Sequence, residues 1–286
     1  MEFNMNALRD VSPVFTRLTR ILPILLASFF VAVPSIADEL ITIRTRPDVT
    51  QSLLLWEPHP TNPDTVILLF PGGPGNIGLA MKDGRAEAAR PYIFSLQREV
   101  LSQQKFAVVV IDAPSDTKEM SQEFRLSERH ATDMEAVALE IKTRFPNSKI
   151  VVLAHSRGTV SAGYFSRRVG EKVGALVLFS GVYRATKLDP LIPSSGPGLS
   201  ELDLGALKVP VLIVHNTKDA CPAAPFKSAE DVAGKLSMIA VNSADEANKG
   251  SPCGPRTNHW FAGMEKETGD EVVKWLVGKS WNRTVP

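Results

Sequence analysis

A serine between small residues is the first candidate for chemistry in this chain. Ser156 lies in the segment AHSRG at 154–158, which follows an apolar run and precedes a segment of helical period. A serine on a tight strand-to-helix turn can act as a nucleophile, and so tight a turn requires small residues two positions before and after it. Taken alone, the same serine could simply cap the helix, because serine is a preferred N-cap residue.

An acid and a histidine follow the serine in the chain order that a hydrolytic triad on such a turn uses. Asp219 comes just after the expected strand 211–215, and His259 lies in an expected loop before the last helix. His259 would accept the proton of Ser156, and Asp219 would hold the imidazole in the required tautomer. Three other carboxylates are alternatives for the acid: Asp189, Asp203 and Asp245.

The remaining four histidines are less well placed to act as the base. His59 lies in an expected edge turn, His130 on an expected helix and His215 at the end of an expected strand. His155 is the neighbour of Ser156 and must point away from it. We therefore expect His155 to be structural.

A glycine-rich segment, PGGPG at 71–75, follows the expected strand 66–70. Backbone N–H groups near the serine are needed to hold the negative charge of a tetrahedral intermediate, and glycines let the main chain approach without an intervening side chain. An ordinary turn and a phosphate-binding loop are the alternatives. The phosphate loop is disfavoured because no Gly-Lys-Ser/Thr follows and the two prolines remove donors.

Short β-rich runs alternate with longer segments of helical period from residue 40 to the end of the chain. This pattern is typical of an α/β fold with a mostly parallel sheet covered by helices on both faces. We expect eight strands, at 40–45, 52–56, 66–70, 106–111, 150–154, 175–179, 211–215 and 238–241. We expect helices at 90–105, 127–144, 156–169, 224–235 and 265–277.

The connections between these elements predict one domain with little covering its site. Residues 46–48 between the first two strands are too few for a helical crossover, so an antiparallel hairpin is expected at one edge. The irregular segment 184–207, between the sixth and seventh strands, predicts a loop or a minimal cap. A chain of 286 residues with 44% hydrophobic residues can bury a sizeable core, so 38–286 should form a single catalytic domain.

The order strand, PGGPG, strand, AHSRG resembles the α/β-hydrolase superfamily. The glycine loop is similar to the His-Gly-Gly-Pro-Gly motif of the proline iminopeptidase-like branch, with Pro71 in place of the histidine, and Ala154 stands where the elbow usually has glycine. The resemblance covers the layout of the whole mature chain, and in residues only these short motifs. It implies an α/β-hydrolase fold and an oxyanion hole formed by the N–H groups of Gly73 and Arg157.

The predicted chemistry is acyl transfer through an acyl-enzyme, which requires no metal and no organic cofactor. No cluster of histidines and carboxylates has the spacing of a zinc site. A carboxylic ester hydrolase is the first hypothesis, because a short insertion favours an accessible ester. An aminopeptidase or amidase with the same residues is the second, and a hydrolase-like binding protein without catalysis is the third. The side chain of Arg157 could contact an acidic substrate group or be a solvated charge at a helix start.

The first 37 residues predict a secretory signal peptide. Three arginines precede the apolar run 21–33, and small residues at 35–37 suit a signal peptidase that cuts before Asp38. A membrane anchor is the alternative, but a span requires roughly 20 apolar residues. We expect an exported protein, periplasmic or secreted, without a stable membrane anchor after cleavage.

The mature chain is expected to carry no net charge. The whole chain has 32 basic and 31 acidic residues, and residues 1–37 hold three of the former and two of the latter, which leaves 29 of each. The residues removed are Arg9, Arg17, Arg20, Glu2 and Asp10. Binding to nucleic acid needs a basic excess that is absent here, so we expect a small-molecule ester or amide as the partner. No feature of the sequence indicates an oligomeric state.

The chain has two cysteines, Cys221 and Cys253, both in the part expected to be exported. In an oxidising compartment an even pair indicates a disulfide before it indicates free thiols or metal ligands. Each cysteine lies within a few residues of a member of the expected triad. The disulfide would therefore tie the loop of Asp219 to the loop of His259.

Overall fold

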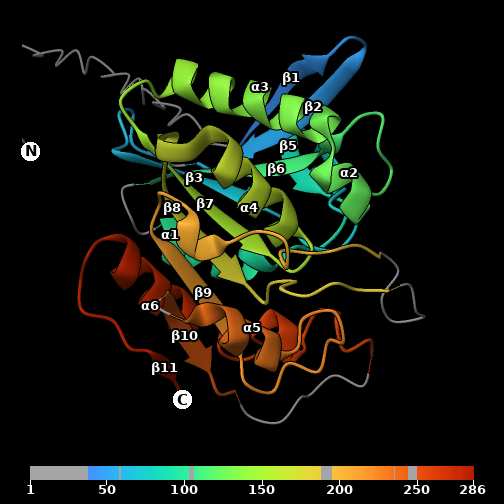
Figure 1. Ribbon diagram of the computed structural model, residues 1–286. Helices are drawn as coiled ribbons and strands as arrows, with labels where there is room; N and C mark the ends of the chain where they lie inside the picture. The colour runs from blue at the N-terminus through green and yellow to red at the C-terminus, as the bar shows by residue number, and fades with distance from the viewer. Residues whose placement is uncertain (1–37, 58, 103–105, 188–194, 235, 244–249) are drawn as a thin grey trace, which may run out of the picture. The chain divides into compact units, whose positions relative to one another are not determined.

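Figure 1 shows the computed structural model, which describes residues 38–57, 59–102, 106–187, 195–234, 236–243 and 250–286. The predicted signal peptide, 1–37, lies outside the described residues. The described residues all belong to one unit of the chain, which runs from residue 36 to residue 286. Cleavage before Asp38 remains a prediction.

One large sheet forms the centre of this unit. Among the described residues its nine strands lie in the order β1-β2-β6-β3-β7-β8-β9-β10-β11. The β1–β2 hairpin lies at one edge and is antiparallel, β2 is also antiparallel to β6, and the other neighbours are parallel. The strands are β1 (Glu39–Arg46), β2 (Val49–Leu55), β3 (Thr65–Phe70), β6 (Phe106–Pro114), β7 (Lys149–His155), β8 (Val173–Phe179), β9 (Val211–Asn216), β10 (Ser237–Val241) and β11 (Thr284–Val285).

The eight predicted strands are all present, each with bounds within three residues of the prediction, and the edge hairpin and fold class are confirmed. The two-residue strand β11, beside β10, was not predicted, because so short a run carries no periodic signal. A separate hairpin of β4 (Leu79–Lys82) and β5 (Arg85–Ala88) was not predicted either, because its largely exposed residues lack the pattern of a strand.

Helices cover both faces of the sheet, as predicted (Figure 1). α3 (Glu128–Arg144), α4 (Gly158–Val169) and α5 (Phe226–Ala233) bury side chains in one hydrophobic core. α1 (Arg98–Ser102) and α6 (Glu265–Leu276) bury side chains in the core on the opposite face. The sheet therefore separates two cores, and both of its faces are shielded from water.

One helical prediction needs correction, and one short helix was not predicted. The expected helix 90–105 is a 3-10 turn at Ile93–Gln97 followed by the five residues of α1, and residues 103–105 lie outside the described part. A short additional helix, α2 (Gln122–Leu126), precedes α3. Ser121 caps α2 and Ser127 caps α3, so the two helices are separate, and α3 agrees with the expected helix 127–144 to within one residue.

The strands carry apolar side chains on both faces because each face of the sheet packs into one of the two cores. In β3, Val66 and Leu68 face the core under α3 and α4, whereas Ile67 and Leu69 face the core under α1 and α6. All four side chains are fully buried. Burying an aliphatic side chain of this size stabilises the fold by roughly 1.5 to 3 kcal/mol, so the central strands are the most stable platform for a site.

The insertion 184–207 forms little regular structure in its described parts. Thr186 and Gly196 pair in an isolated bridge, and a 3-10 turn lies at Leu204–Ala206. Leu199 packs on α4 at Gly163, where an added Cβ would lie 2.6 Å from its side chain. The insertion thus packs onto the domain as a minimal cap, in line with the prediction.

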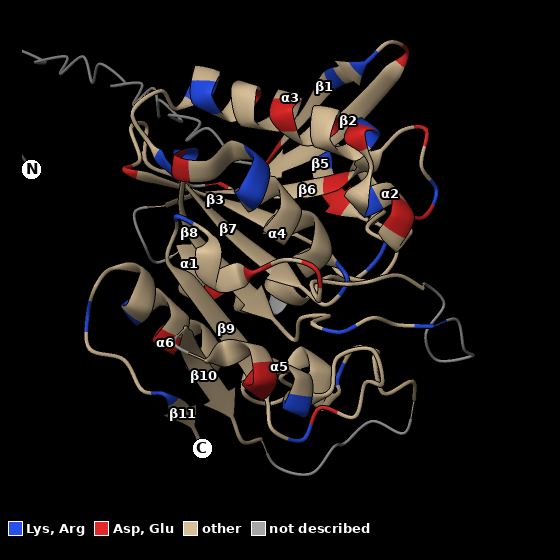
Figure 2. Ribbon diagram, viewed as in Figure 1, with Lys and Arg blue, Asp and Glu red and all other residues tan. Residues whose placement is uncertain are grey.

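Charged residues of both signs are interspersed on the face drawn in Figure 2. On α3 and α4 they pair with each other, as Arg168 does with Glu135 at 2.8 Å and Arg144 with Glu140 at 2.7 Å. In the part of the chain that the structure describes, no helix is both long and apolar enough to cross a bilayer.

Candidate active site

The candidate site lies at the carboxyl ends of the parallel strands. The PGGPG loop follows β3, Ser156 follows β7, and Asp219 follows β9. His259 follows the long connection after β10, in a 3-10 turn at Asn258–Trp260. Loops at the carboxyl edge of a parallel sheet are where α/β proteins bind ligands, so this topology collects the predicted residues at one edge.

Ser156 has the backbone of a strained turn. Its φ is +51°, a left-handed conformation that is uncommon for a residue with a side chain. The turn is held by the N–H of Ser156, which donates to the carbonyl oxygen of Phe179 at 2.9 Å, and by the N–H of Thr159, which donates to the carbonyl oxygen of Ser156 at 3.0 Å. Strain of this kind at the start of a helix fits a functional turn better than a simple helix cap.

The residues around the turn must be small, and the contacts show why. A Cβ on Gly158 would lie 2.5 Å from the carbonyl oxygen of Phe70 and 2.6 Å from that of Pro71. A Cβ on Gly72 would lie 2.9 Å from Nδ1 of His155 and 3.0 Å from Cβ of Ser156. The PGGPG loop therefore packs directly against the turn that carries the serine.

The PGGPG loop is held from the side of α2. The buried Arg125 donates to the carbonyl oxygens of Gly73 and Met120, each at 3.2 Å, and to Oγ of Ser161 at 2.9 Å. Burial, and to a lesser extent the positive charge of the neighbouring Arg157, lowers the pKa of Arg125 to about 9. Gly73 itself has a φ of +58°, which only glycine adopts without cost. These contacts fix the path of the main chain at Gly73, one of the two predicted oxyanion donors.

The residues that follow this loop are anchored by a buried carboxylate. Asp112 accepts the N–H groups of Ile77 at 2.8 Å and Leu79 at 2.7 Å. Asp112 lies near the end of β6, the strand next to β3. Asp112 was not among the predicted site residues, because nothing in the local pattern of β6 distinguishes it from a surface aspartate.

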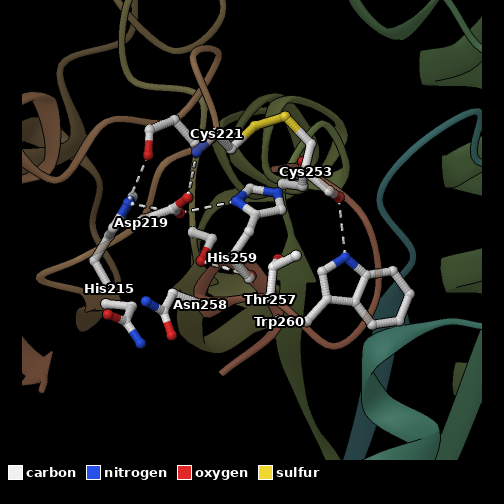
Figure 3. Close-up of polar contacts among 12 residues, drawn as sticks. His215, Asp219, Cys221, Cys253, Thr257, Asn258, His259 and Trp260 are labelled. Atoms are coloured by element: carbon white, nitrogen blue, oxygen red, sulfur yellow. Dashed lines mark hydrogen bonds and ion pairs between the residues drawn. A yellow bond between two sulfur atoms is a disulfide. The ribbon is translucent and has the colours of Figure 1, made fainter. Parts of the chain in front are cut away.

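His259 and Asp219 form a buried pair, shown in Figure 3. Nδ1 of His259 lies 2.8 Å from Oδ2 of Asp219, and both side chains are essentially inaccessible to solvent. Because a carboxylate can only accept, the hydrogen of this contact is on Nδ1. The tautomer that results leaves Nε2 as the acceptor, which is the state required of a general base.

Two further donors face the same carboxylate. Oδ1 of Asp219 accepts the N–H of Cys221 at 2.8 Å, and Nε2 of His215 lies 3.3 Å from Oδ2. Burial alone would raise the pKa of Asp219, but His259 and His215 outweigh it and hold that pKa well below its ordinary value. Asp219 is therefore ionised at neutral pH.

The main chain of His259 is docked onto the strands that flank the serine. Its carbonyl oxygen accepts from Nε2 of His155 and from Oγ of Ser180, each at 3.0 Å. Burial lowers the pKa of His155 to about 3, so its ring is neutral, with a hydrogen on Nε2. His155 thus has a structural role, and the ring also packs against that of His259, with their centroids 4.9 Å apart.

The acid loop and the histidine loop are joined by a disulfide and by hydrogen bonds. Cys221 and Cys253 lie in a disulfide, with their Cα atoms 4.7 Å apart (Figure 3). A buried polar chain runs from Asn216 through Ser243 to Asn258, whose Oδ1 accepts from Oγ of Ser243 at 2.8 Å. The disulfide was predicted from the sequence, whereas the polar chain was not, because its three residues are far apart in the sequence.

Nε2 of His259 is buried and has no hydrogen-bond partner among the described residues. In particular, no hydrogen bond joins it to Ser156. In enzymes without bound substrate, catalytic hydrogen bonds are often long and tighten in the complex. The nitrogen that would accept a proton is therefore not engaged with any other group that the structure describes.

The other predicted candidates lie in different settings. The Arg157 side chain pairs with Glu119 at 3.2 Å and is largely buried, so it is not the free solvated charge considered above. Asp203 caps the 3-10 turn at Leu204–Ala206 and does not contact His259. Asp189 and Asp245 lie outside the described residues. Among residues with described positions, no group of histidine, cysteine and carboxylate side chains is arranged to hold a metal ion.

Comparison with solved structures identifies the fold. Carboxylesterase CesB from Bacillus subtilis superposes with a TM-score of 0.56 at 14% identity, over 86% of this chain and 94% of that one. Dienelactone hydrolase from Anabaena variabilis gives 0.56 at 14% identity, over 85% and 98%. An α/β serine hydrolase without a lid from Xanthomonas campestris gives 0.53 at 11% identity, over 84% and 95%.

The chain therefore has the α/β-hydrolase fold, as the resemblance implied. No family model and no curated protein sequence matches the chain. Membership of the proline iminopeptidase-like branch remains a prediction.

Proposed function

We propose that this chain is an exported serine hydrolase that cleaves carboxylic esters through Ser156, His259 and Asp219. The observation that carries the proposal is the buried contact of 2.8 Å between Nδ1 of His259 and Oδ2 of Asp219, in a fold where a serine stands on a strained turn after β7. A histidine whose Nδ1 is fixed by an ionised carboxylate has its Nε2 available to accept a proton.

The proposed reaction has two halves. Oγ of Ser156 attacks the ester carbonyl carbon while Nε2 of His259 accepts its proton, and the N–H groups of Gly73 and Arg157 donate to the developing oxyanion. The alcohol leaves with the proton from His259, and the acyl group remains on Ser156. Water then attacks the acyl-enzyme with His259 again as base, which releases the acid and restores the serine.

An ester substrate and an amide substrate differ in the leaving group, which is an alcohol in the first case and an amine in the second. The described parts of the insertion 184–207 add only a bridge and a short turn over the domain, which supports an accessible ester substrate. The solved structures of similar fold include a carboxylesterase, which adds support from that neighbour's own description. The aminopeptidase or amidase alternative rests on the PGGPG loop alone.

A panel of p-nitrophenyl esters and aminoacyl anilides tests the substrate class. We expect ester hydrolysis that exceeds anilide hydrolysis by orders of magnitude, with Ser156→Ala as the blank for each substrate. Faster cleavage of the anilides would replace the esterase with an aminopeptidase. The absence of turnover on both classes and of labelling by a fluorophosphonate would favour a hydrolase-like binding protein.

Export is the remaining part of the proposal, and the cysteine pair supports it, because disulfides persist in oxidising compartments. The predicted first mature residue is also anchored. The carboxylate of Asp38 accepts hydrogen bonds from Nη1 of Arg98 at 2.7 Å and from the N–H of Glu57 at 2.9 Å. Expression of the full chain followed by N-terminal sequencing should yield Asp38 in an exported fraction. Recovery of Met1 in the cytoplasm would overturn export.

A further inference from the structure

A second histidine contacts the carboxylate of Asp219. His215 is the last but one residue of β9, and its side chain is fully buried. Its Nε2 lies 2.8 Å from the carbonyl oxygen of Ala224 and 3.3 Å from Oδ2 of Asp219, as the dashed lines in Figure 3 show. Oδ2 is also the oxygen that accepts from His259.

The partners of His215 settle which nitrogen carries the hydrogen. A carbonyl oxygen can only accept, so the contact with Ala224 requires an N–H on Nε2. Oδ2 of Asp219 lies 3.3 Å from the same nitrogen, so the carboxylate is within reach of the same donor. Nδ1 of His215 is buried and has no hydrogen-bond partner in the described part of the chain.

The ring of His215 is itself held in place. It packs between the rings of Tyr183 and Phe226, whose centroids lie 6.1 and 6.0 Å from its own. With Nε2 bonded to the main chain at Ala224, the imidazole has little freedom to turn. Tyr183 follows β8, and Ala224 and Phe226 lie together at the start of α5, so two segments hold this donor beside Asp219.

We infer that His215 is a positioning residue, which holds Oδ2 of Asp219 in the orientation that receives Nδ1 of His259. This inference rests on the proposed hydrolase function. Three groups face the carboxylate: the N–H of Cys221 on Oδ1, and His259 and His215 on Oδ2. Without His215, Oδ2 loses a buried donor, and the carboxylate can rotate toward the remaining one. His215 does not touch the reacting atoms, so it acts only through Asp219.

The test is a double-mutant cycle between His215 and Asp219, measured as kcat and KM on the best ester substrate. His215→Phe keeps an aromatic ring in the aromatic site but removes the donor, and we expect kcat to fall about tenfold with KM unchanged. His215→Gln restores an N–H near the Nε2 position and should recover most of the rate. In the Asp219→Asn background, His215→Phe should lower kcat almost no further. His215 acts on the rate only through the Asp219 carboxylate, so the two losses should not multiply.

Two controls separate positioning from loss of structure. His130→Phe replaces another buried histidine, whose ring packs against Phe124 of α2, and should leave kcat within twofold of the wild type. The proton resonance of Nδ1–H in His259, assigned by its loss in His259→Gln, should shift in His215→Phe and return in His215→Gln. This resonance reports on the Asp219 contact whether or not the protein turns over an ester.

The outcomes are distinguishable. If the His215→Phe and Asp219→Asn losses multiply, or if the His259 resonance stays unmoved in His215→Phe, the positioning role is wrong. If Ser156→Ala retains full hydrolysis, the proposed function fails instead, and the resonance still decides the role of His215. A fall in kcat with coupling to Asp219 and a shifted resonance would support the inference.

Discussion

Nε2 of His155 lies 3.0 Å from the main-chain carbonyl oxygen of His259, so the residue before the candidate nucleophile anchors the loop of the candidate base. The same oxygen accepts a hydrogen bond from Oγ of Ser180, also at 3.0 Å. The histidine loop is thus fixed to the ends of β7 and β8 at one atom. The side chain of His259 is fixed independently by Asp219, which separates the positioning of its backbone from that of its ring.

The first prediction compares His155→Ala with His259→Ala. Loss of His155 removes one of two donors to the His259 carbonyl, and a single hydrogen bond contributes about 0.5 to 1.5 kcal/mol, so kcat should fall by roughly tenfold or less. Loss of His259 removes the proposed base, and a fall of about a thousandfold or more is expected. Steady-state kinetics well below the melting temperature of each variant measure both. A larger loss in His155→Ala than in His259→Ala would reverse the assignment.

The second prediction concerns the disulfide between Cys221 and Cys253. The two cysteines are 32 positions apart in sequence, and the chain-entropy model gives about 3 to 4 kcal/mol for a closed loop of that length. Because N–H of Cys221 also donates to Asp219, Cys221→Ser/Cys253→Ser should lower both the melting temperature and kcat. Thiol titration of the denatured, unreduced wild type should find no free thiol. Two thiols per chain, or unchanged melting in the double variant, would contradict the role given to the bridge.

The third prediction is a loss of stability in mild acid. Burial lowers the pKa of His130 and of His155 to about 3, whereas a histidine in the unfolded chain has a pKa near 6.5. Between these values the unfolded chain binds protons that the folded chain does not, so the free energy of unfolding falls as the pH drops below about 6.5. At pH 5 the loss is about 2 kcal/mol for each histidine.

Urea denaturation of the wild type and His130→Phe at pH 8 and pH 5 measures this loss. The free energy of unfolding should fall between pH 8 and pH 5 by about 2 kcal/mol less in His130→Phe than in the wild type. Any change in packing caused by the substitution is present at both pH values and cancels in this comparison. An equal difference in both proteins would mean that His130 takes up a proton in the folded state.

The fourth prediction tests the tight fit of the turn after Ser156. Gly158→Ala places a methyl group 2.5 Å from the carbonyl oxygen of Phe70, which is main chain and cannot move away cheaply. Overpacking of this kind costs about 1 to 3 kcal/mol, and a shift of β3 would also move the PGGPG loop and lower kcat. Gly174→Ala is the matched control, since its methyl group would lie 3.4 Å from Lys149. Equal stability and activity in both variants would contradict the proposed fit.

Local patterns in the sequence were sufficient for the fold and for the candidates. The continuous apolar runs of β3, β6 and β7 predict buried parallel strands, and the AHSRG turn is a signal of five adjacent residues. The strands β4 and β5 escaped prediction because their side chains are mostly exposed and polar. Sequence patterns report burial, and these strands bury little.

The supporting contacts of the site could not be predicted in the same way. His215 is four positions from Asp219, a spacing that brings side chains together on a helix but has no such meaning across the end of a strand. Ser180 and His259 are 79 positions apart, and Ser243 reaches Asn216 only because β9 and β10 are neighbours in the sheet. These contacts depend on the path of the loops in space, and no local residue pattern encodes it.

Labelling with a fluorophosphonate, followed by peptide mass spectrometry, decides whether Ser156 is the nucleophile. We expect one adduct per chain, on the peptide that contains Ser156. In Ser156→Ala we expect no adduct and at least about a thousandfold less ester hydrolysis, with Ser200→Ala as the matched control that labels like the wild type. Labelling of folded Ser156→Ala at the wild-type level, or unchanged ester hydrolysis by that variant, would mean that Ser156 is not the nucleophile.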